Sequence, residues 1–276
     1  MASAEPVLGQ IPSIALRKFK TPPGLEGQEQ QRFEFQEAFR NLRASLLFMN
    51  TGSARPKTII ITSSVPAEGK TTVALHLAAT LAKGNARVLL VDGDMRRPRL
   101  HTFFGLPPGP GLAELLNHEL PSVDVSFPEG LENLAFLPAG RAKRHPGDLA
   151  LSPAWPQFLA AIQAQFDFIL VDTPPVAATD DAAALAPKAD GALFVVRALS
   201  TSARVARGAL EILRQRHTCV LGLIFNGAVS SPCERQYYQP YARAYHWAPD
   251  PTGSTRPTGH LLSSPAKKVN AAGARD

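Results

Sequence analysis

Apolar residues occur along this chain in short runs that alternate with amphipathic stretches. The runs are almost continuously apolar, which is typical of parallel strands that are covered on both faces. They occupy residues 57–62, 87–92, 133–138, 166–172, 191–196 and 219–225. Apolar residues at helical spacing predict helices between them, over 70–83, 111–117, 153–165, 179–186 and 202–216. The alternation predicts an α/β fold: a doubly wound, mostly parallel sheet with helices on both faces.

The two ends of the chain differ in composition from the segment with apolar runs between them. Residues 1–30 are rich in Pro, Gly and Gln, and we expect them to form a disordered N-terminal arm. A helical pattern of apolar residues follows over 33–49 and opens a domain that we place at 31–227. Residues 228–276 are rich in Pro, Ser, Gly and charge, which predicts a flexible tail.

The segment SSVPAEGKTT, Ser63 to Thr72, follows a predicted strand and opens a predicted helix. This is the context that a P-loop requires, because loop N–H groups and the positive helix end then converge on phosphate oxygens. Lys70 would add a positive charge at the β- and γ-phosphates, and the Thr71 hydroxyl would bind Mg²⁺. Ser64 stands where the usual pattern has Gly or Ala. The residues expected to contact the nucleotide are Ser64, Ala67, Glu68, Gly69, Lys70, Thr71 and Thr72.

Acidic residues stand at the ends of two predicted strands. Asp92 and Asp94 follow VLLV, and Asp172 follows FILV. Open α/β sheets bind ligands at the carboxyl ends of their strands, and Mg²⁺ favours few carboxylates with several waters. An aspartate at a strand end commonly caps a helix instead; that reading explains one such residue well and the three together poorly.

Amino-acid composition excludes fewer classes of function than these motifs do. The formal net charge of +6 is compatible with nucleic acid, anionic lipid or acidic partners. We expect no nucleic-acid partner, because neither a recognition helix nor a stacking platform is evident. Two cysteines provide no disulfide framework. No apolar run approaches the length of a membrane span, so we expect a cytoplasmic protein that a partner recruits to the membrane.

All four tyrosines of the chain lie in one short stretch of the predicted tail. They are Tyr237, Tyr238, Tyr241 and Tyr245. The alternative is that they pack against a neighbouring surface, but Pro240 and the Pro- and Ser-rich flanks favour exposure. A phosphate-binding domain with its phenols on a tail predicts that the tail accepts phosphate.

The sequence resembles the bacterial tyrosine kinases of capsule and exopolysaccharide synthesis, within the MinD/ParA-like P-loop ATPase superfamily. The resemblance covers about Phe33 to Gly227 and rests on SSVPAEGKTT, VLLVDGDMR, ILVDTPP and VLGLIFN. One departure is the basic stretch RAKRHPGDLALS at 141–152. Another is the run of about thirty residues after the last tyrosine.

The resemblance implies a role for each site residue. Asp92 accepts the proton of the tyrosine hydroxyl, Asp94 supports the metal and its waters, and Asp172 holds Mg²⁺ through water. Asn226 contacts adenine, although a simple turn residue is the alternative there. The implied reaction is transfer of the γ-phosphoryl group of ATP, in trans, to the tail tyrosines of a neighbour.

The segment EAFRNLR places Glu37, Arg40 and Arg43 on one helical face. By itself such a face is more often a solvated stripe of ion pairs. The resemblance instead implies a subunit contact in a ring-like homo-oligomer. It also implies a separate transmembrane polysaccharide chain-length (co-polymerase) protein as activator, an opposing protein-tyrosine phosphatase, and recruitment to the inner face of the cell membrane.

Two other functions are compatible with a P-loop domain. A MinD/ParA-type positioning or partitioning ATPase carries a lysine near the start of the loop, whereas this chain has Val65 followed by Pro66. A weakly active scaffold that binds ATP is the second alternative. The complete set of Lys70, Thr71 and three aspartates argues against it.

Overall fold

The computed structural model describes residues 5–13, 25–49, 55–120, 122–229 and 267–270. Within these ranges, a 7-stranded sheet has the order β1-β8-β7-β2-β6-β3-β5, and all of its paired strands are parallel. Its strands are β1 Val7–Pro12, β2 Thr58–Ser63, β3 Val88–Asp92, β5 Leu134–Leu137, β6 Phe168–Asp172, β7 Gly191–Arg197 and β8 Val220–Ala228. The strands β4 Ser122–Val125 and β9 Lys267–Asn270 form a separate antiparallel pair.

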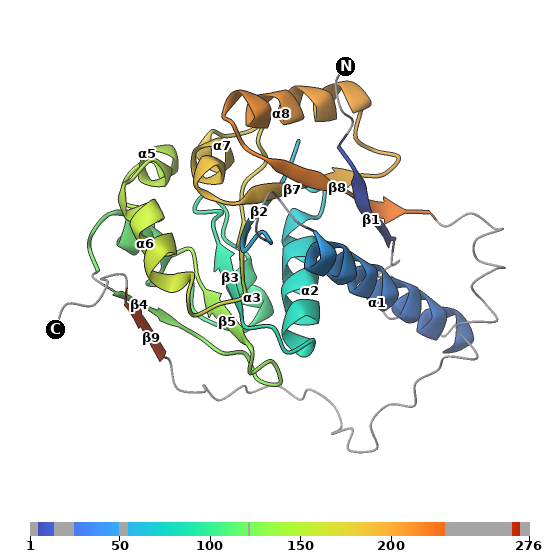
Figure 1. The fold of residues 1–276 in the computed structure, drawn as a ribbon, viewed down its shortest axis with the longest axis horizontal. Helices are drawn as coiled ribbons and strands as arrows, with labels where there is room; N and C mark the ends of the chain where they lie inside the picture. The colour runs from blue at the N-terminus through green and yellow to red at the C-terminus, as the bar shows by residue number, and fades with distance from the viewer. Residues whose placement is uncertain (1–4, 14–24, 50–54, 121, 230–266, 271–276) are drawn as a thin grey trace.

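Helices cover both faces of the large sheet (Figure 1). One face packs against α1 and α2, and the other packs against α4 to α8. The helices are α1 Leu25–Phe48, α2 Lys70–Lys83, α3 Leu100–Phe103, α4 Leu112–Leu116, α5 Pro146–Ala150, α6 Ala154–Ile162, α7 Asp181–Leu185 and α8 Ala203–Gln215, with a 3₁₀ turn at Ala186–Lys188. The predicted doubly wound α/β fold is confirmed.

The central strands are buried on both faces because their side chains alternate between two hydrophobic clusters. In β2, Ile60 joins the cluster under α4 to α8, whereas Ile59 and Ile61 join the cluster under α1 and α2. All residues of β2 are buried. This two-sided burial explains why the strands appear in the sequence as continuous apolar runs.

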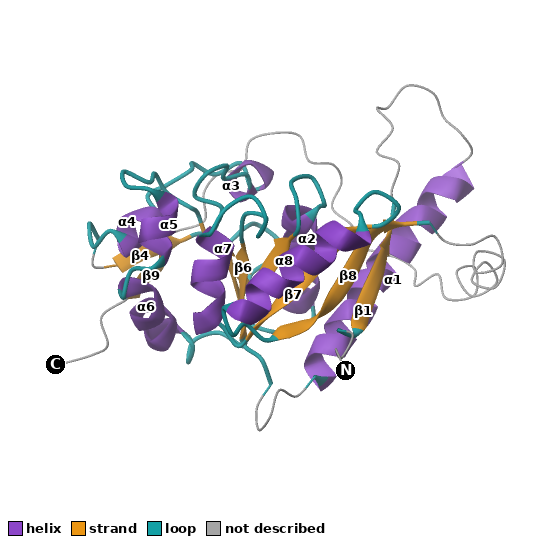
Figure 2. Cartoon of the chain, turned by 90° about the horizontal axis from the view of Figure 1, so that it is seen from above, coloured by secondary structure: helices purple, strands orange, loops and turns teal. Residues whose placement is uncertain are grey.

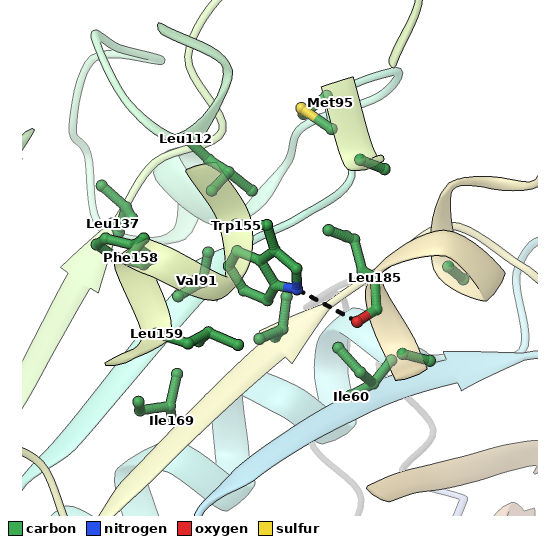
Figure 3. Packing of buried hydrophobic residues seen from close by; sticks show 14 of the residues in the cluster. Ile60, Val91, Met95, Leu112, Leu137, Trp155, Phe158, Leu159, Ile169 and Leu185 are labelled. Atoms are coloured by element: carbon green, nitrogen blue, oxygen red, sulfur yellow. Dashed lines mark hydrogen bonds between the residues drawn. The ribbon is translucent and has the colours of Figure 1, made fainter. Parts of the chain in front are cut away.

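Trp155 of α6 lies in the cluster under α4 to α8 and is fully buried (Figure 3). Its indole N–H donates a hydrogen bond to the Leu185 carbonyl at 3.2 Å. Phe158 and Leu159 of α6 lie beside it, over strand residues such as Val91 and Ile169. The bond satisfies the one polar group of the indole and links α6 to the end of α7.

The prediction of a disordered arm over 1–30 is wrong at residues 7–12, which form the edge strand β1. This strand pairs with β8, and Ile11 is only 1% exposed. The helix predicted over 33–49 also begins earlier, at Leu25, and runs beside the β1 edge (Figure 2). The segment VLGQIP was not predicted as a strand because it contains Gly and Pro, which are uncommon in strands. Its pairing with β8 stabilises it as a strand.

The prediction of a flexible tail over 228–276 is wrong at two places. Strand β8 continues to Ala228, and residues 267–270 form β9, which pairs with β4. Neither β4 nor α3 was predicted, because each is short and forms through contacts with distant segments. The tyrosines at 237–245 lie outside the described residues.

None of the helices in the described part combines the length and apolar composition that a bilayer span requires.

Candidate nucleotide site

Strand register brings the predicted motifs to one edge of the sheet. Asp92 at the end of β3 pairs with Asp172 at the end of β6, and Asp172 also pairs with Ile61 of β2. The loop that follows β2 therefore starts beside both carboxylates. This is the carboxyl edge of the strands, where a ligand site is expected in an open α/β sheet.

The phosphate loop makes a tight turn before α2 begins at Lys70. Gly69 has a φ of 91°, and a Cβ there would lie 1.9 Å from Asn226 Nδ2. The Asn226 amide donates to the Glu68 carbonyl at 2.8 Å. Position 69 must therefore be glycine, for its backbone angle and for its close approach to β8. The structure places Asn226 against the loop and buries it, with 7% exposed.

Lys70 and Asp94 face each other in the cleft beside this loop. Lys70 Nζ lies 3.8 Å from Asp94 Oδ2, and the other Asp94 oxygen accepts the Arg97 N–H at 2.9 Å. The N–H groups of the first turn of α2 lack intrahelical acceptors, as at any helix start. Lysine, helix start and loop backbone thus point positive groups at the same space.

The cleft has a volume of about 1550 Å³ and extends from the loop to the groove between α1 and α2. Gly69, Lys70, Thr71 and Thr72 line it, as does Asn226. Most of its charged lining is positive, which suits a polyanion such as a triphosphate. Cationic side chains from other segments in the lining include Arg40, Lys83, Arg96, Arg97, Arg99 and Arg197.

Asp172 is buried beneath the cleft, with 1% exposed. One of its oxygens, Oδ1, has no hydrogen-bond partner, and its carboxyl group makes a side-chain hydrogen bond with Thr71. Burial raises the pKa of Asp172 to about 7, while the charge of Lys70 and the Thr71 hydrogen bond lower it. A buried carboxylate oxygen without a partner, next to a hydroxyl, is a suitable ligand set for a small hard cation.

These residues fit Mg²⁺, although they do not form a cage. No group of three or more His, Cys, Asp or Glu side chains within the described ranges is arranged as a metal site. Mg²⁺ generally takes one or two protein carboxylates, and waters and substrate phosphates complete its shell. Thr71 and Asp172 match that limited share, whereas Asp94 is engaged with Lys70 and Arg97.

Asp92 lies deeper than the sequence suggested. It is 0% exposed, and its oxygens accept the N–H groups of Asp94, Arg99 and Leu100 at 3.3, 3.2 and 3.0 Å. Its pKa is raised to about 8, first by burial and then by the charge of Asp172. Asp92 thus faces the backbone at the start of α3 and does not contact the cleft in this conformation.

The side chains of Ser64 and Glu68 turn inward as well. Ser64 is 0% and Glu68 is 2% exposed, and the Ser64 hydroxyl donates to Glu68 Oε2 at 2.9 Å. The two residues therefore bind each other, and any contact with a nucleotide is through their backbone. Ala67 and Thr72 are exposed on the cleft side, and Ala67 has a φ of 66°.

The predicted contact residues of α1 have different surroundings. Arg40 forms an ion pair with Glu37, and its side chain is 52% exposed. Arg43 donates to the Thr80 carbonyl at 3.3 Å and lies against Gly84, at the end of α2. Arg43 is therefore bound within its own chain, while Glu37 and Arg40 remain at the surface.

Arg96, to which no sequence motif assigned a role, forms a specific pair with Asp181. Its guanidinium donates to both oxygens of Asp181, at 2.7 and 2.9 Å, and Asp181 is fully buried. Arg96 also lines the cleft. The pairing of DGDMRR with ATDD could not be read from the sequence, since 85 positions separate the partners.

Comparisons with known proteins agree with this geometry. The family model of the CobQ/CobB/MinD/ParA nucleotide binding domain matches residues 59–239. The tyrosine-protein kinase YwqD of Bacillus subtilis is 34% identical over 204 residues, covering 73% of this chain and 85% of that protein. The succinoglycan biosynthesis transport protein ExoP of Rhizobium meliloti is 38% identical over 203 residues, covering 71% of this chain and 25% of that protein.

Among solved structures, the kinase domain of the Escherichia coli tyrosine kinase ETK superposes with a TM-score of 0.69 at 26% identity. The match covers 82% of this chain and 93% of that domain. Several relatives are much longer than this chain, which spans only 25–29% of their length.

Proposed function

Because this chain belongs to the CobQ/CobB/MinD/ParA nucleotide-binding family and, within it, to the tyrosine-protein kinases, we propose that it transfers the γ-phosphoryl group of ATP to protein tyrosines. The observation that carries the proposal is the register that joins Asp92, Asp172 and the phosphate loop at one edge of the sheet. The match with YwqD, which covers most of both chains, supports the tyrosine as acceptor.

Catalysis in this proposal depends on positioning and charge. The loop N–H groups and Lys70 bind the phosphates and stabilise the charge on the transferred group. Thr71 and Asp172 would hold Mg²⁺, which would neutralise negative charge on the nucleotide phosphates. Asp94, 3.8 Å from Lys70, keeps the ammonium group directed along the cleft.

Asp92 is the proposed acceptor of the tyrosine proton. The pKa of Asp92 is about 8. This value is closer to the pKa of a phenol, about 10, than the pKa of an ordinary aspartate is. A base must also come within hydrogen-bond reach of the proton. The segment between Asp92 and Leu100, whose N–H groups now occupy its oxygens, must therefore shift when the acceptor binds.

The acceptors in this proposal are Tyr237, Tyr238, Tyr241 and Tyr245, phosphorylated in trans by a neighbouring copy. The assembly would be a ring-like homo-oligomer in contact through α1. We further propose that the kinase regulates exopolysaccharide or capsule synthesis and export, since one relative is named as a succinoglycan biosynthesis transport protein. A separate transmembrane chain-length protein would activate it at the inner face of the membrane, and a protein-tyrosine phosphatase would oppose it.

The test is phosphotyrosine formation by the purified chain with Mg-ATP. The wild type should become labelled, and Lys70→Met should lose the label, because the positive charge that binds and stabilises the phosphates is removed. Lys188→Met, at an exposed lysine far along the chain, is the matched control. A label retained in Lys70→Met would show that the kinase activity is not that of this site.

Two further variants test the phosphate acceptors and the proton acceptor separately. Changing the four tyrosines to Phe should remove the label without changing ATP affinity, and mass spectrometry of the tail should locate the phosphates. Asp92→Asn should lower the rate at least about 100-fold while nucleotide still binds. ATP hydrolysis without any phosphotyrosine in the wild type would instead favour the positioning ATPase.

A further inference from the structure

The phosphate loop is fastened to a distant turn through the side chain of Glu68. One carboxylate oxygen, Oε2, accepts the Val65 N–H at 2.7 Å and the Ser64 hydroxyl at 2.9 Å. The other, Oε1, accepts the Arg197 N–H at 3.3 Å and the hydroxyl of Thr201. Arg197 ends β7 and Thr201 precedes α8, so Glu68 connects two segments about 130 positions apart.

The backbone of the same residue is held from another side. The Glu68 carbonyl accepts the Asn226 amide, from β8, at 2.8 Å. The side chain is 2% exposed and its two oxygens are directed at donors inside the protein. A carboxylate this close to bound phosphates would repel them if it faced the cleft. Because it faces inward, it can accept hydrogen bonds that hold the loop without repelling the phosphates.

We propose that Glu68 is a positioning residue that holds the loop in its phosphate-binding shape and couples that shape to the turn at Arg197–Thr201. The proposal rests on nucleotide binding at this loop, which is part of the proposed function. Glu68 acts through the backbone and does not contact the nucleotide with its carboxylate. The Arg197 N–H and the Thr201 hydroxyl thereby support the nucleotide site from outside the loop.

The loop requires such support because its backbone is unfavourable on its own. Ala67 has a φ of 66°, in the left-handed region, which is costly for a residue that carries a Cβ. Conformations of this kind persist only when surrounding contacts hold them. A loop that is already held binds a ligand without a further ordering cost, and a released loop binds more weakly.

The experiment measures Mg-ADP affinity, with a fluorescent ADP analogue, for variants on both sides of the contact. Glu68→Ala should weaken binding about tenfold, because buried N–H groups lose their acceptor and the loop relaxes. Thr201→Val, which lies outside the loop, should weaken binding about threefold, and Thr201→Ser should restore wild-type affinity. Ser200→Ala, an exposed neighbour in the same turn, is the matched control.

Amide hydrogen exchange gives a second readout that needs no ligand. The amides of Val65 and Arg197 both donate to Glu68, so both should exchange faster in Glu68→Ala, while the amide of Ile60 in the buried strand β2 should not change. Unchanged exchange at Val65 and Arg197 would overturn the proposal even if the variant folds poorly.

A double-mutant cycle tests the coupling itself. If Glu68 and Thr201 act as one unit, Glu68→Ala combined with Thr201→Val should bind no more weakly than Glu68→Ala alone. Independent, additive effects would overturn the coupling, as would equal affinity for Thr201→Val and wild type. A chain that binds Mg-ADP and follows this pattern but makes no phosphotyrosine would refute the kinase proposal and leave this one standing.

Discussion

Buried carboxylates at the strand ends make the nucleotide-free protein sensitive to pH. The pKa of Asp172 is raised to about 7 and that of Asp92 to about 8 in the folded state, against about 3.9 for an unfolded aspartate. Between those values the folded chain holds protons that the unfolded chain has released. The stability that these two groups contribute is therefore complete below about pH 4 and is lost as the pH rises toward 8.

Replacing Asp172 with Asn should remove much of this dependence. Each extra proton bound by the folded state changes the free energy of unfolding by about 1.4 kcal/mol per pH unit. Asp172→Asn should thus flatten the curve by up to that slope between pH 5 and 7, and it should be more stable than wild type at pH 8. It also removes a charge that raises the pKa of Asp92.

Urea unfolding at pH 5, 6, 7 and 8, without nucleotide or Mg²⁺, provides the measurement. Glu129→Gln, which removes an exposed carboxylate, is the control and should run parallel to wild type. A parallel curve for Asp172→Asn would mean that its pKa is not raised in the folded protein.

At the scale of single elements, the edge strand β1 extends the core. Its backbone pairs with β8, and Ile11 is buried in the cluster under α1 and α2. The strand thus covers an edge of the parallel sheet and gives α1 a surface to pack against. The short apolar stretch contributes stability only because these two neighbours exist.

Truncating Ile11 should reveal that contribution. Ile11→Ala removes a buried side chain and should cost about 2–5 kcal/mol in the free energy of unfolding, whereas a disordered arm would give no change. Val7→Ala, on the same strand but 51% exposed, should stay within about 0.5 kcal/mol of wild type. Denaturant unfolding of both variants decides between the two states of this segment.

At the scale of the whole molecule, α1 separates two arginines that the sequence had grouped together. Arg43 donates to the carbonyl of Thr80 near the end of α2, so it supports its own domain. Arg40, with Glu37, remains at the surface and is available to a second copy. The proposed assembly thus depends on Arg40, whereas Arg43 contributes to the stability of its own domain.

Single substitutions should separate the two roles. Arg40→Ala should lower the particle mass measured by light scattering while changing stability by no more than about 0.5 kcal/mol. Arg43→Ala should lower the free energy of unfolding by about 1 kcal/mol. Arg32→Ala, at another exposed arginine of α1, is the control for mass. An unchanged mass for Arg40→Ala would remove this helix face from the assembly.

The sequence by itself determined the features that depend on local pattern. Continuous apolar runs predicted the parallel strands, and the helix at Lys70–Lys83 was predicted to the residue. The phosphate loop and the strand-end aspartates were also predicted, because each motif lies within a few consecutive residues. The order of the strands was not predicted; the structure supplies it, and the pairing of β3 with β6 brings those motifs to one edge.

Only the tertiary structure decided which way the site side chains face. Asp92 turns toward the start of α3, and Glu68 turns toward Thr201, although both stand in motifs that suggest contact with the ligand. Likewise, β1 exists because β8 lies beside it. In each case the partner is distant in sequence, and the hydrogen bonds and burial that fix the direction form only when the fold brings the segments together.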